Sequence, residues 1–105
     1  MAANRRRGEV AITLDGRERR LCLTLGALAE LEDRFGTDLS GLIARLSQGR
    51  LAAADMTAVI GAGLRGAGED ASDEAVAAMR AEGGAVGFAR ATVELLQATF
   101  GGEDE

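Results

Sequence analysis

The sequence contains no histidine, proline, lysine, tryptophan or tyrosine, and it has a single cysteine, Cys22. Without histidine and with one thiol, a zinc or other transition-metal site lacks its usual ligands. Cys22 also has no imidazole in the sequence that could activate it as a nucleophile, and it has no partner for an intrachain disulfide. We therefore expect no catalytic residues, no metal and no cofactor.

Long apolar runs are missing as well. No stretch approaches the roughly 20 apolar residues that a membrane helix needs, and no apolar run follows Arg5-Arg6-Arg7 as it would in a signal peptide. We therefore expect a cytoplasmic protein with no membrane partner. The formal net charge of −5 argues against a nucleic-acid partner, because such binding needs cations that displace counterions from phosphates.

All twelve cationic residues are arginine. The codon bias of a GC-rich genome is one explanation of this composition. Bidentate pairing with the carboxylates of a partner protein is another, because the planar guanidinium matches a carboxylate.

The first part of the chain has the pattern of a β-hairpin. Its apolar residues recur at every second position: Val10, Ile12 and Leu14, then Leu21, Leu23 and Leu25. This period of two is typical of half-buried strands, and Asp15-Gly16 is a strong turn signal. A two-residue loop pairs Ile12 with Arg19, whereas a four-residue loop (15–18) pairs Ile12 with Leu21. We favour the longer loop, because it matches apolar residues across the strands.

Beyond the hairpin the apolar spacing becomes helical, and we expect about five short helices packed as a small bundle. Their apolar positions are Leu25, Leu28, Leu31 and Phe35; Leu39, Leu42, Ile43 and Leu46; Met56, Val59, Ile60 and Leu64; Val76 and Met79; and Val86, Ala89, Val93, Leu96 and Phe100, widened by Phe88 and Leu95. Asp55 is expected to cap the third helix and Ser72 the fourth. The glycine-rich segment 61–68 is expected to end or loosen the third helix, and Gly83-Gly84 to separate the last two.

With 105 residues, the chain has room for one ordinary domain. The predicted class is α+β, mostly α. The single domain 1–105 divides into a flexible basic N-terminus (1–7), a β-hairpin (8–25), a helical bundle (26–100) and an acidic tail (101–105). The glycine-rich segment has neither the lysine ending nor the preceding strand of a phosphate-binding loop, so a helix end is the preferred interpretation.

Several stretches resemble the small tail-assembly protein of gene transfer agents, the phage-like particles of alphaproteobacteria. They are Asn4, Arg7-Gly8-Glu9-Val10, Leu14-Asp15-Gly16, the segment 21–32, the segment 61–68 and Ser72-Asp73-Glu74. This family is grouped with phage tail assembly chaperones and sometimes with tail tube proteins. The resemblance implies a non-catalytic protein that coats the tape-measure protein, keeps it soluble and helps to recruit tail tube subunits.

A tape-measure protein is a long helix with an apolar stripe, so binding it calls for an apolar groove between helices. We hypothesise that part of the apolar surface of the first two helices or of the last helix serves this role. The candidate residues are Leu28, Leu31, Leu39, Leu42, Leu46, Val93, Leu96 and Phe100. The alternative interpretation is that these residues form the core, and for most of them we favour it.

Two other functions compete with a chaperone. One is a structural component of the tail, against which the single hairpin argues, because a tube subunit needs enough strands for a continuous β-ring. The other is a small DNA-binding or regulatory helical protein, against which the acidic charge argues. The oligomeric state stays open, with a homo-oligomer among the options.

Overall fold

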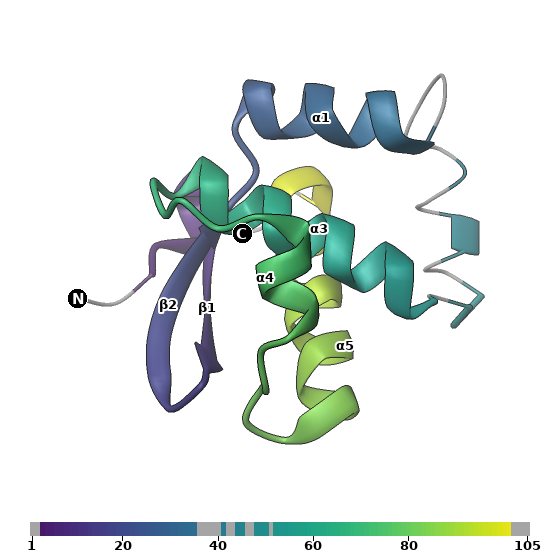
Figure 1. The fold of residues 1–105 in the computed structure, drawn as a ribbon. Coiled ribbons are helices and arrows are strands. Elements are labelled where there is room, and N and C mark those ends of the chain that lie inside the picture. Colours follow the sequence, from purple (N-terminus) through teal and green to yellow (C-terminus); the bar gives the residue numbers. More distant parts are fainter. Residues whose placement is uncertain (1–2, 36–40, 42–43, 46–47, 51, 102–105) are drawn as a thin grey trace.

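A computed structural model describes residues 3–35, 41, 44–45, 48–50 and 52–101 (Figure 1). In chain order the elements are the 3-10 turn η1 (Arg5–Arg7), the strands β1 (Glu9–Leu14) and β2 (Arg17–Cys22), the helices α1 (Leu25–Phe35), α3 (Ala53–Gly66), α4 (Asp73–Ala77) and α5 (Gly84–Leu96), and the π-helical turn η2 (Gln97–Gly101). The predicted α+β class with an N-terminal hairpin is confirmed. The described residues contain four α-helices rather than about five, and most of the predicted second helix lies outside them.

The hairpin turns at Asp15-Gly16 through two residues, so the four-residue loop favoured above is wrong. Ile12 pairs with Arg19. Asp15 and Gly16 have φ values of 52° and 79°, the left-handed pair of a type I′ turn, whose twist matches that of the flanking strands. Turn geometry therefore outweighs the matching of apolar residues across the strands. Arg19 is accommodated because its guanidinium pairs with Glu69, outside the hairpin.

The chain before β1 is anchored to it. The backbone carbonyl of Asn4 accepts hydrogen bonds from the N–H groups of Arg7 and Glu9, at 2.9 and 3.0 Å. In return the Glu9 carboxylate accepts a bond from the Asn4 N–H at 3.0 Å. Residues 5–7, for which the sequence predicts a flexible end, form a 3-10 turn between Asn4 and Glu9.

The segment after α4 runs along the outer edge of β1. The Asp15 N–H donates to the Arg80 carbonyl at 2.8 Å, and the Glu82 N–H donates to the Thr13 carbonyl at 3.0 Å. The end of β1 nearest the turn is therefore bonded on both sides. The two-stranded order β1-β2 leaves β2 with an outer edge on which no strand lies in the described part of the chain.

Helix α3 is central: it contacts β2, α1, α4 and α5 (Figure 1). Its residues 58–64 are all buried, as expected of a helix enclosed by other elements. The glycine-rich segment 61–68 ends this helix as predicted, at Gly66, but residues 61–66 are themselves helical. A Cβ on Gly63 would lie 2.8 Å from Leu95 Cδ2, and one on Gly66 would overlap the Cys22 carbonyl oxygen. These glycines allow neighbouring elements to approach closely.

One of the two predicted helix caps is confirmed. Ser72 caps α4 as predicted, since its Oγ accepts a hydrogen bond from the Ala75 N–H at 3.0 Å. Asp55 is not the cap of α3. The helix begins at Ala53 after Ala52, and the Asp55 carboxylate accepts a bond from the Ala52 N–H at 3.0 Å, from within the first turn.

The core lies between the inner face of the hairpin and the helices. Its fully buried large side chains are Leu14, Leu21, Leu31, Ile60, Leu64, Leu95, Leu96, Val59, Val76 and Thr92. The predicted stripe of α5 is wrong in part: the helix buries Ala91, Thr92, Leu95 and Leu96, whereas Val86 is 66% exposed. The buried face is set by the elements on which α5 packs, β1 and α3, and the sequence does not fix this choice.

Candidate protein-interaction site

The structure divides the eight predicted binding residues into groups. Leu31 and Leu96 are buried in the core, at 1% and 2% exposure, and Leu28 is partly buried against it. Val93 is half-buried, and Phe100 is 45% exposed. The remaining three, Leu39, Leu42 and Leu46, lie outside the described residues. The candidates therefore do not form one exposed surface among the residues described.

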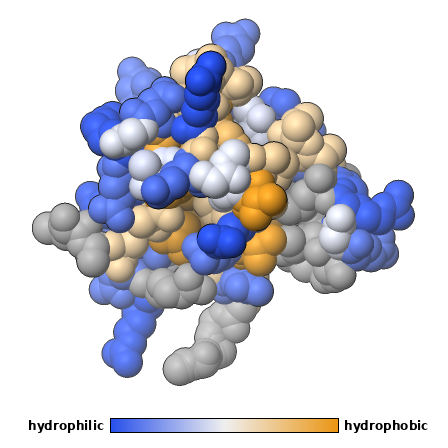
Figure 2. All heavy atoms as spheres, turned by 90° about the horizontal axis from the view of Figure 1, so that it is seen from below, coloured by the Kyte–Doolittle hydropathy of each residue, from blue (hydrophilic) through white to orange (hydrophobic). Residues whose placement is uncertain are grey.

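An apolar strip faces outward on α5. Val86 is exposed, while Ala89 and Val93 are half-buried, and Phe100 in η2 continues the line. Figure 2, which views the molecule from the end where α5 begins, shows apolar residues at the surface beside charged ones. Exposed apolar residues at helical spacing suit contact with another protein.

Leu25 is the most exposed large apolar residue of the described chain, at 86%. It stands at the first position of α1, two residues before the buried Ala27. The sequence groups Leu25 with the buried leucines, because it continues both the period of two of the second strand and the helical spacing that leads to Leu28.

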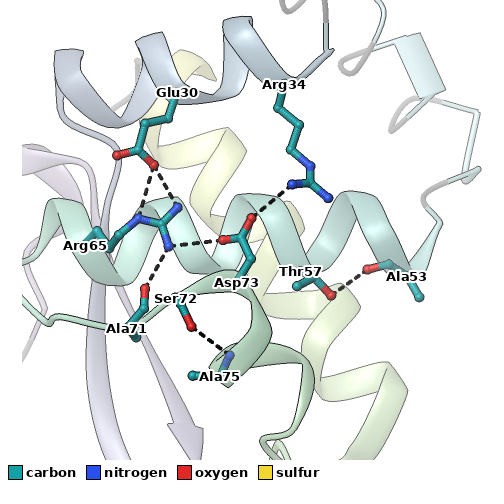
Figure 3. Close-up of polar contacts among 9 residues, drawn as sticks. All are labelled: Glu30, Arg34, Ala53, Thr57, Arg65, Ala71, Ser72, Asp73 and Ala75. Atoms are coloured by element: carbon teal, nitrogen blue, oxygen red, sulfur yellow. Dashed lines mark hydrogen bonds and ion pairs between the residues drawn. The ribbon is translucent and has the colours of Figure 1, made fainter.

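A network of four charged side chains joins α1, α3 and α4 (Figure 3). Arg65 of α3 donates to the Glu30 carboxylate at 2.7 and 3.1 Å and to the Asp73 carboxylate at 3.1 Å. Its Nη1 also donates to the Ala71 carbonyl at 2.7 Å. Arg34 pairs with the other Asp73 oxygen at 3.2 Å.

The hydrogen bonding that Arg65 donates to Glu30 is the largest cause that raises the pKa of Arg65. Burial lowers this pKa, while the bond donated to Asp73 and the charges of both carboxylates raise it further. The guanidinium stays charged and has acceptors from three segments. Beside it lies an open hollow of about 900 Å³ between α1, α3 and α4. Since each carboxylate already accepts from arginine, the arrangement serves to hold the helices together.

A second charged cluster lies along β2. Arg19 and Arg17 share the Glu69 carboxylate; Arg17 is 67% exposed and lies 3.5 Å from it. Arg20, on the other face of the strand, is 43% exposed and 3.9 Å from Glu9. A hollow of about 350 Å³ between β2 and the loop after α3 is lined by these three arginines together with Glu18 and Glu69.

Charge is unevenly distributed along the chain. Residues 1–25 contain six arginines and three acidic residues, whereas residues 26–105 contain six arginines and fourteen acidic residues. The hairpin is therefore the basic part of an acidic protein. This difference is readable from the sequence, but only the fold shows that Arg17, Arg19 and Arg20 line one hollow.

The described residues contain no group of three or more cysteine and acidic side chains that could hold a metal ion. Within the same residues, no helix has both the length and the apolar character needed to cross a membrane. Cys22 is half-buried, with its Sγ 3.8 Å from the Arg7 carbonyl oxygen. What the described surface offers is charged and apolar contact area.

Sequence reasoning missed both charged clusters. Arg65 and its partners Glu30 and Asp73 are 35 and 8 residues apart in the chain, so no local spacing connects them. The excess of arginine was the one indication, since it suggested pairing with carboxylates. It did not identify which carboxylates, or that several belong to the same chain.

Comparison with known proteins places the chain in a family. No curated protein and no solved structure matches it. The model of a family described as "Phage tail tube protein, GTA-gp10" matches residues 7–102. The match includes the hairpin, all four described helices and both charged clusters. The chain therefore belongs to the phage tail tube protein family GTA-gp10.

Proposed function

We propose that this protein is a non-catalytic structural component of a phage-like tail, such as that of a gene transfer agent, and that it works through contacts with other tail proteins. The observation that carries the proposal is the family match over residues 7–102. The surface supports it, because an apolar strip on α5 and an arginine-rich strand are exposed on one small domain.

The decisive measurement is the amount of this protein in purified particles. We expect a fixed ratio of this protein to the other tail proteins, measured by mass spectrometry with isotope-labelled peptides, that survives density-gradient and size-exclusion steps. The control is a particle preparation from cells that lack the gene and carry it back on a plasmid. Tailed particles that contain none of the protein would contradict a structural role.

An assembly chaperone is the second candidate, and the small sheet favours it. The described chain has two strands, and the outer edge of β1 is already bonded near its turn. A subunit of this kind has few strands to contribute to a continuous β-ring. In this role the partners are the tape-measure protein and the tail tube protein.

Co-expression separates the two candidates. A chaperone increases the soluble fraction of the tape-measure protein, co-purifies with it and is absent from finished particles. A structural component is retained in the particle whether or not it changes tape-measure solubility. A nucleic-acid partner, which the acidic charge disfavours, would instead show as a salt-dependent gel shift.

A further inference from the structure

The hairpin turn Asp15-Gly16 has two features that favour a reaction between its own groups. Glycine has no side chain, so the backbone at Gly16 can approach the carboxyl group of Asp15 closely. Both residues are exposed, and a Cβ on Gly16 would meet no atom within 4 Å, so that side of the turn is open to water. No other aspartate in the sequence is followed by glycine.

The reaction open to this pair is isomerisation of the aspartate through a cyclic imide. The Gly16 nitrogen forms a bond to Asp15 Cγ, its proton passes to solvent, and a C–O bond of the protonated carboxyl breaks with release of water. Water then reopens the ring. When it attacks the main-chain carbonyl carbon, the product is isoaspartate, in which the main chain runs through Cβ and Cγ. One water leaves and one returns, so the step needs no oxidant and no cofactor.

The segment after α4 holds the carboxylate of this turn. The Asp15 N–H donates to the Arg80 carbonyl at 2.8 Å, and in return Asp15 Oδ1 accepts a hydrogen bond from the Arg80 N–H at 3.0 Å. Glu82 continues the contact by donating to the Thr13 carbonyl. Ring closure requires the carboxyl group to turn towards the Gly16 nitrogen, and it gives up the bond from Arg80 to do so. The contact with this segment therefore opposes the reaction.

The protecting segment is itself weakly anchored. It follows a helix of five residues, α4, and it includes Arg80, which is exposed, as are residues 82–86 beyond it. Gly83 and Gly84 have positive φ values of 89° and 65°, a backbone conformation that glycine enters and leaves easily. Exposed segments with few buried contacts open more often than the core does. The segment can therefore leave the turn while the rest of the fold stays intact.

We propose that Asp15-Gly16 is a site of spontaneous isoaspartate formation in the folded protein, and that the segment 80–82 sets its rate. Opening of this segment frees the carboxylate and starts the reaction. The product then weakens the contact permanently, because isoaspartate adds one main-chain atom to the two-residue turn and Arg80 loses its carboxylate acceptor. The inference is independent of the proposed function, since it depends on the turn and its neighbouring segment alone.

The test incubates the full chain at neutral pH and physiological temperature for several weeks. Isoaspartate is measured by transfer of a labelled methyl group with a protein isoaspartyl methyltransferase. It is located by peptide mapping, because a protease that cleaves before aspartate does not cleave before isoaspartate. We expect isoaspartate at Asp15 and not at the aspartates that precede larger residues, such as Asp33, Asp55, Asp70 and Asp73. A native chain without isoaspartate at Asp15 would overturn the proposal.

Two variants at one position test the role of the segment after α4. Arg80→Pro removes the N–H that donates to the Asp15 carboxylate, whereas Arg80→Gln keeps this N–H and removes only the charge of the side chain. We expect Arg80→Pro to form isoaspartate about tenfold faster, as the loss of one hydrogen bond to a charged group predicts. Arg80→Gln should react at the wild-type rate. Equal rates in all three chains would overturn control by this segment.

If Arg80→Pro does not fold, the wild-type chain in concentrated urea gives the comparison, because there the segment no longer covers the turn. Isoaspartate should form at least about tenfold faster in urea than in the native chain. A native rate equal to the denatured rate would overturn the protecting role. Amide hydrogen exchange tests the effect of the product: exchange in residues 80–82 should be faster in the isoaspartate fraction, separated by ion exchange, than in fresh protein. Unchanged exchange would overturn the weakening of the contact by isoaspartate.

Discussion

The two faces of α3 are held by different forces. Toward β2 the helix packs on Leu21, with Gly63 and Gly66 bringing the backbones close together. Toward α1 and α4 it presents Arg65, which bonds to Glu30 and to the first residue of α4. In the first contact Leu21 and Gly63 are buried, while Gly66 and Cys22 are half-buried. In the second, the Arg65 side chain is 29% exposed and that of Glu30 is 50% exposed.

This difference shows which contact supplies stability and which supplies orientation. Burying apolar surface gives about 25 cal/mol per Å² and has no preferred direction. Half-exposed ion pairs contribute little free energy, but a guanidinium that bonds to Glu30, Ala71 and Asp73 restricts how α1 and α4 sit on α3. We therefore expect substitutions in the β2 contact to lower the free energy of unfolding. Loss of the Arg65 contact should lower it only slightly but should make α4 less ordered.

The largest effect is expected from Leu21→Ala, which leaves a cavity between β2 and α3. The free energy of unfolding should fall by about 3 kcal/mol, the middle of the range for a buried leucine. Urea denaturation followed by circular dichroism measures it. Leu25→Ala, at a leucine that is 86% exposed, is the matched control and should change the value by less than about 0.5 kcal/mol. Similar losses in both variants would mean that β2 does not pack on α3 as described.

A smaller loss is expected from Gly66→Ala. The added Cβ overlaps the backbone carbonyl of Cys22, which cannot rotate away, so we expect a loss of about 2 kcal/mol from overpacking. In the same experiment Gly26→Ala should raise stability by up to about 1 kcal/mol, because its Cβ meets only Thr24 Oγ1 at 3.8 Å and alanine favours helix. A gain in both variants would show that α3 does not lie close against β2.

The smallest loss is expected from Arg65→Gln, at about 1 kcal/mol, and it should shrink as salt is added. Amide hydrogen exchange should nonetheless speed up in α4 relative to α3, since Asp73 loses a partner. Arg90→Gln removes an exposed arginine of α5 and is the control. Unchanged exchange in α4 would show that the network does not orient this helix.

The contribution of Arg65 to the free energy of unfolding should not change with pH near neutrality. The pKa of Arg65 is raised in the folded protein, so its contribution is complete below the ordinary arginine pKa and is lost only as pH rises through the folded value. The difference in unfolding free energy between wild type and Arg65→Gln should thus stay constant between about pH 7 and pH 9. A difference that falls over this interval would mean that another group controls the network.

Local chemistry made several elements predictable. The Asp15-Gly16 turn, the Ser72 cap and the break at Gly83-Gly84 all follow from residues close in the chain, and the structure confirms them. The register of the hairpin is also predictable from the sequence, because Asp15-Gly16 favours the left-handed backbone of a two-residue turn. In this hairpin the turn decides the register, and the pairing of apolar residues across the strands does not.

Other features had no local signal. Glycines that end a helix and glycines that let a helix pack closely look alike in the segment 61–68, and only the presence of Cys22 and Leu95 against α3 decides between them. The apolar residues of α5 span too wide an arc for the sequence to choose the buried face. Its spacing places Val86 in the apolar stripe of this helix, whereas in the fold Val86 is exposed.

The sequence by itself determined that this is a small α+β protein with no histidine and one cysteine, and with its arginines over-represented in a basic hairpin. These properties depend on residue types and on spacings of a few residues. The tertiary structure decided which residues are core, and it brought Arg65 to Glu30 and Arg19 to Glu69. It also left β2 with an outer edge on which no strand of the described residues lies. Such contacts join residues about 35 and 50 apart, so they exist only once the chain has packed.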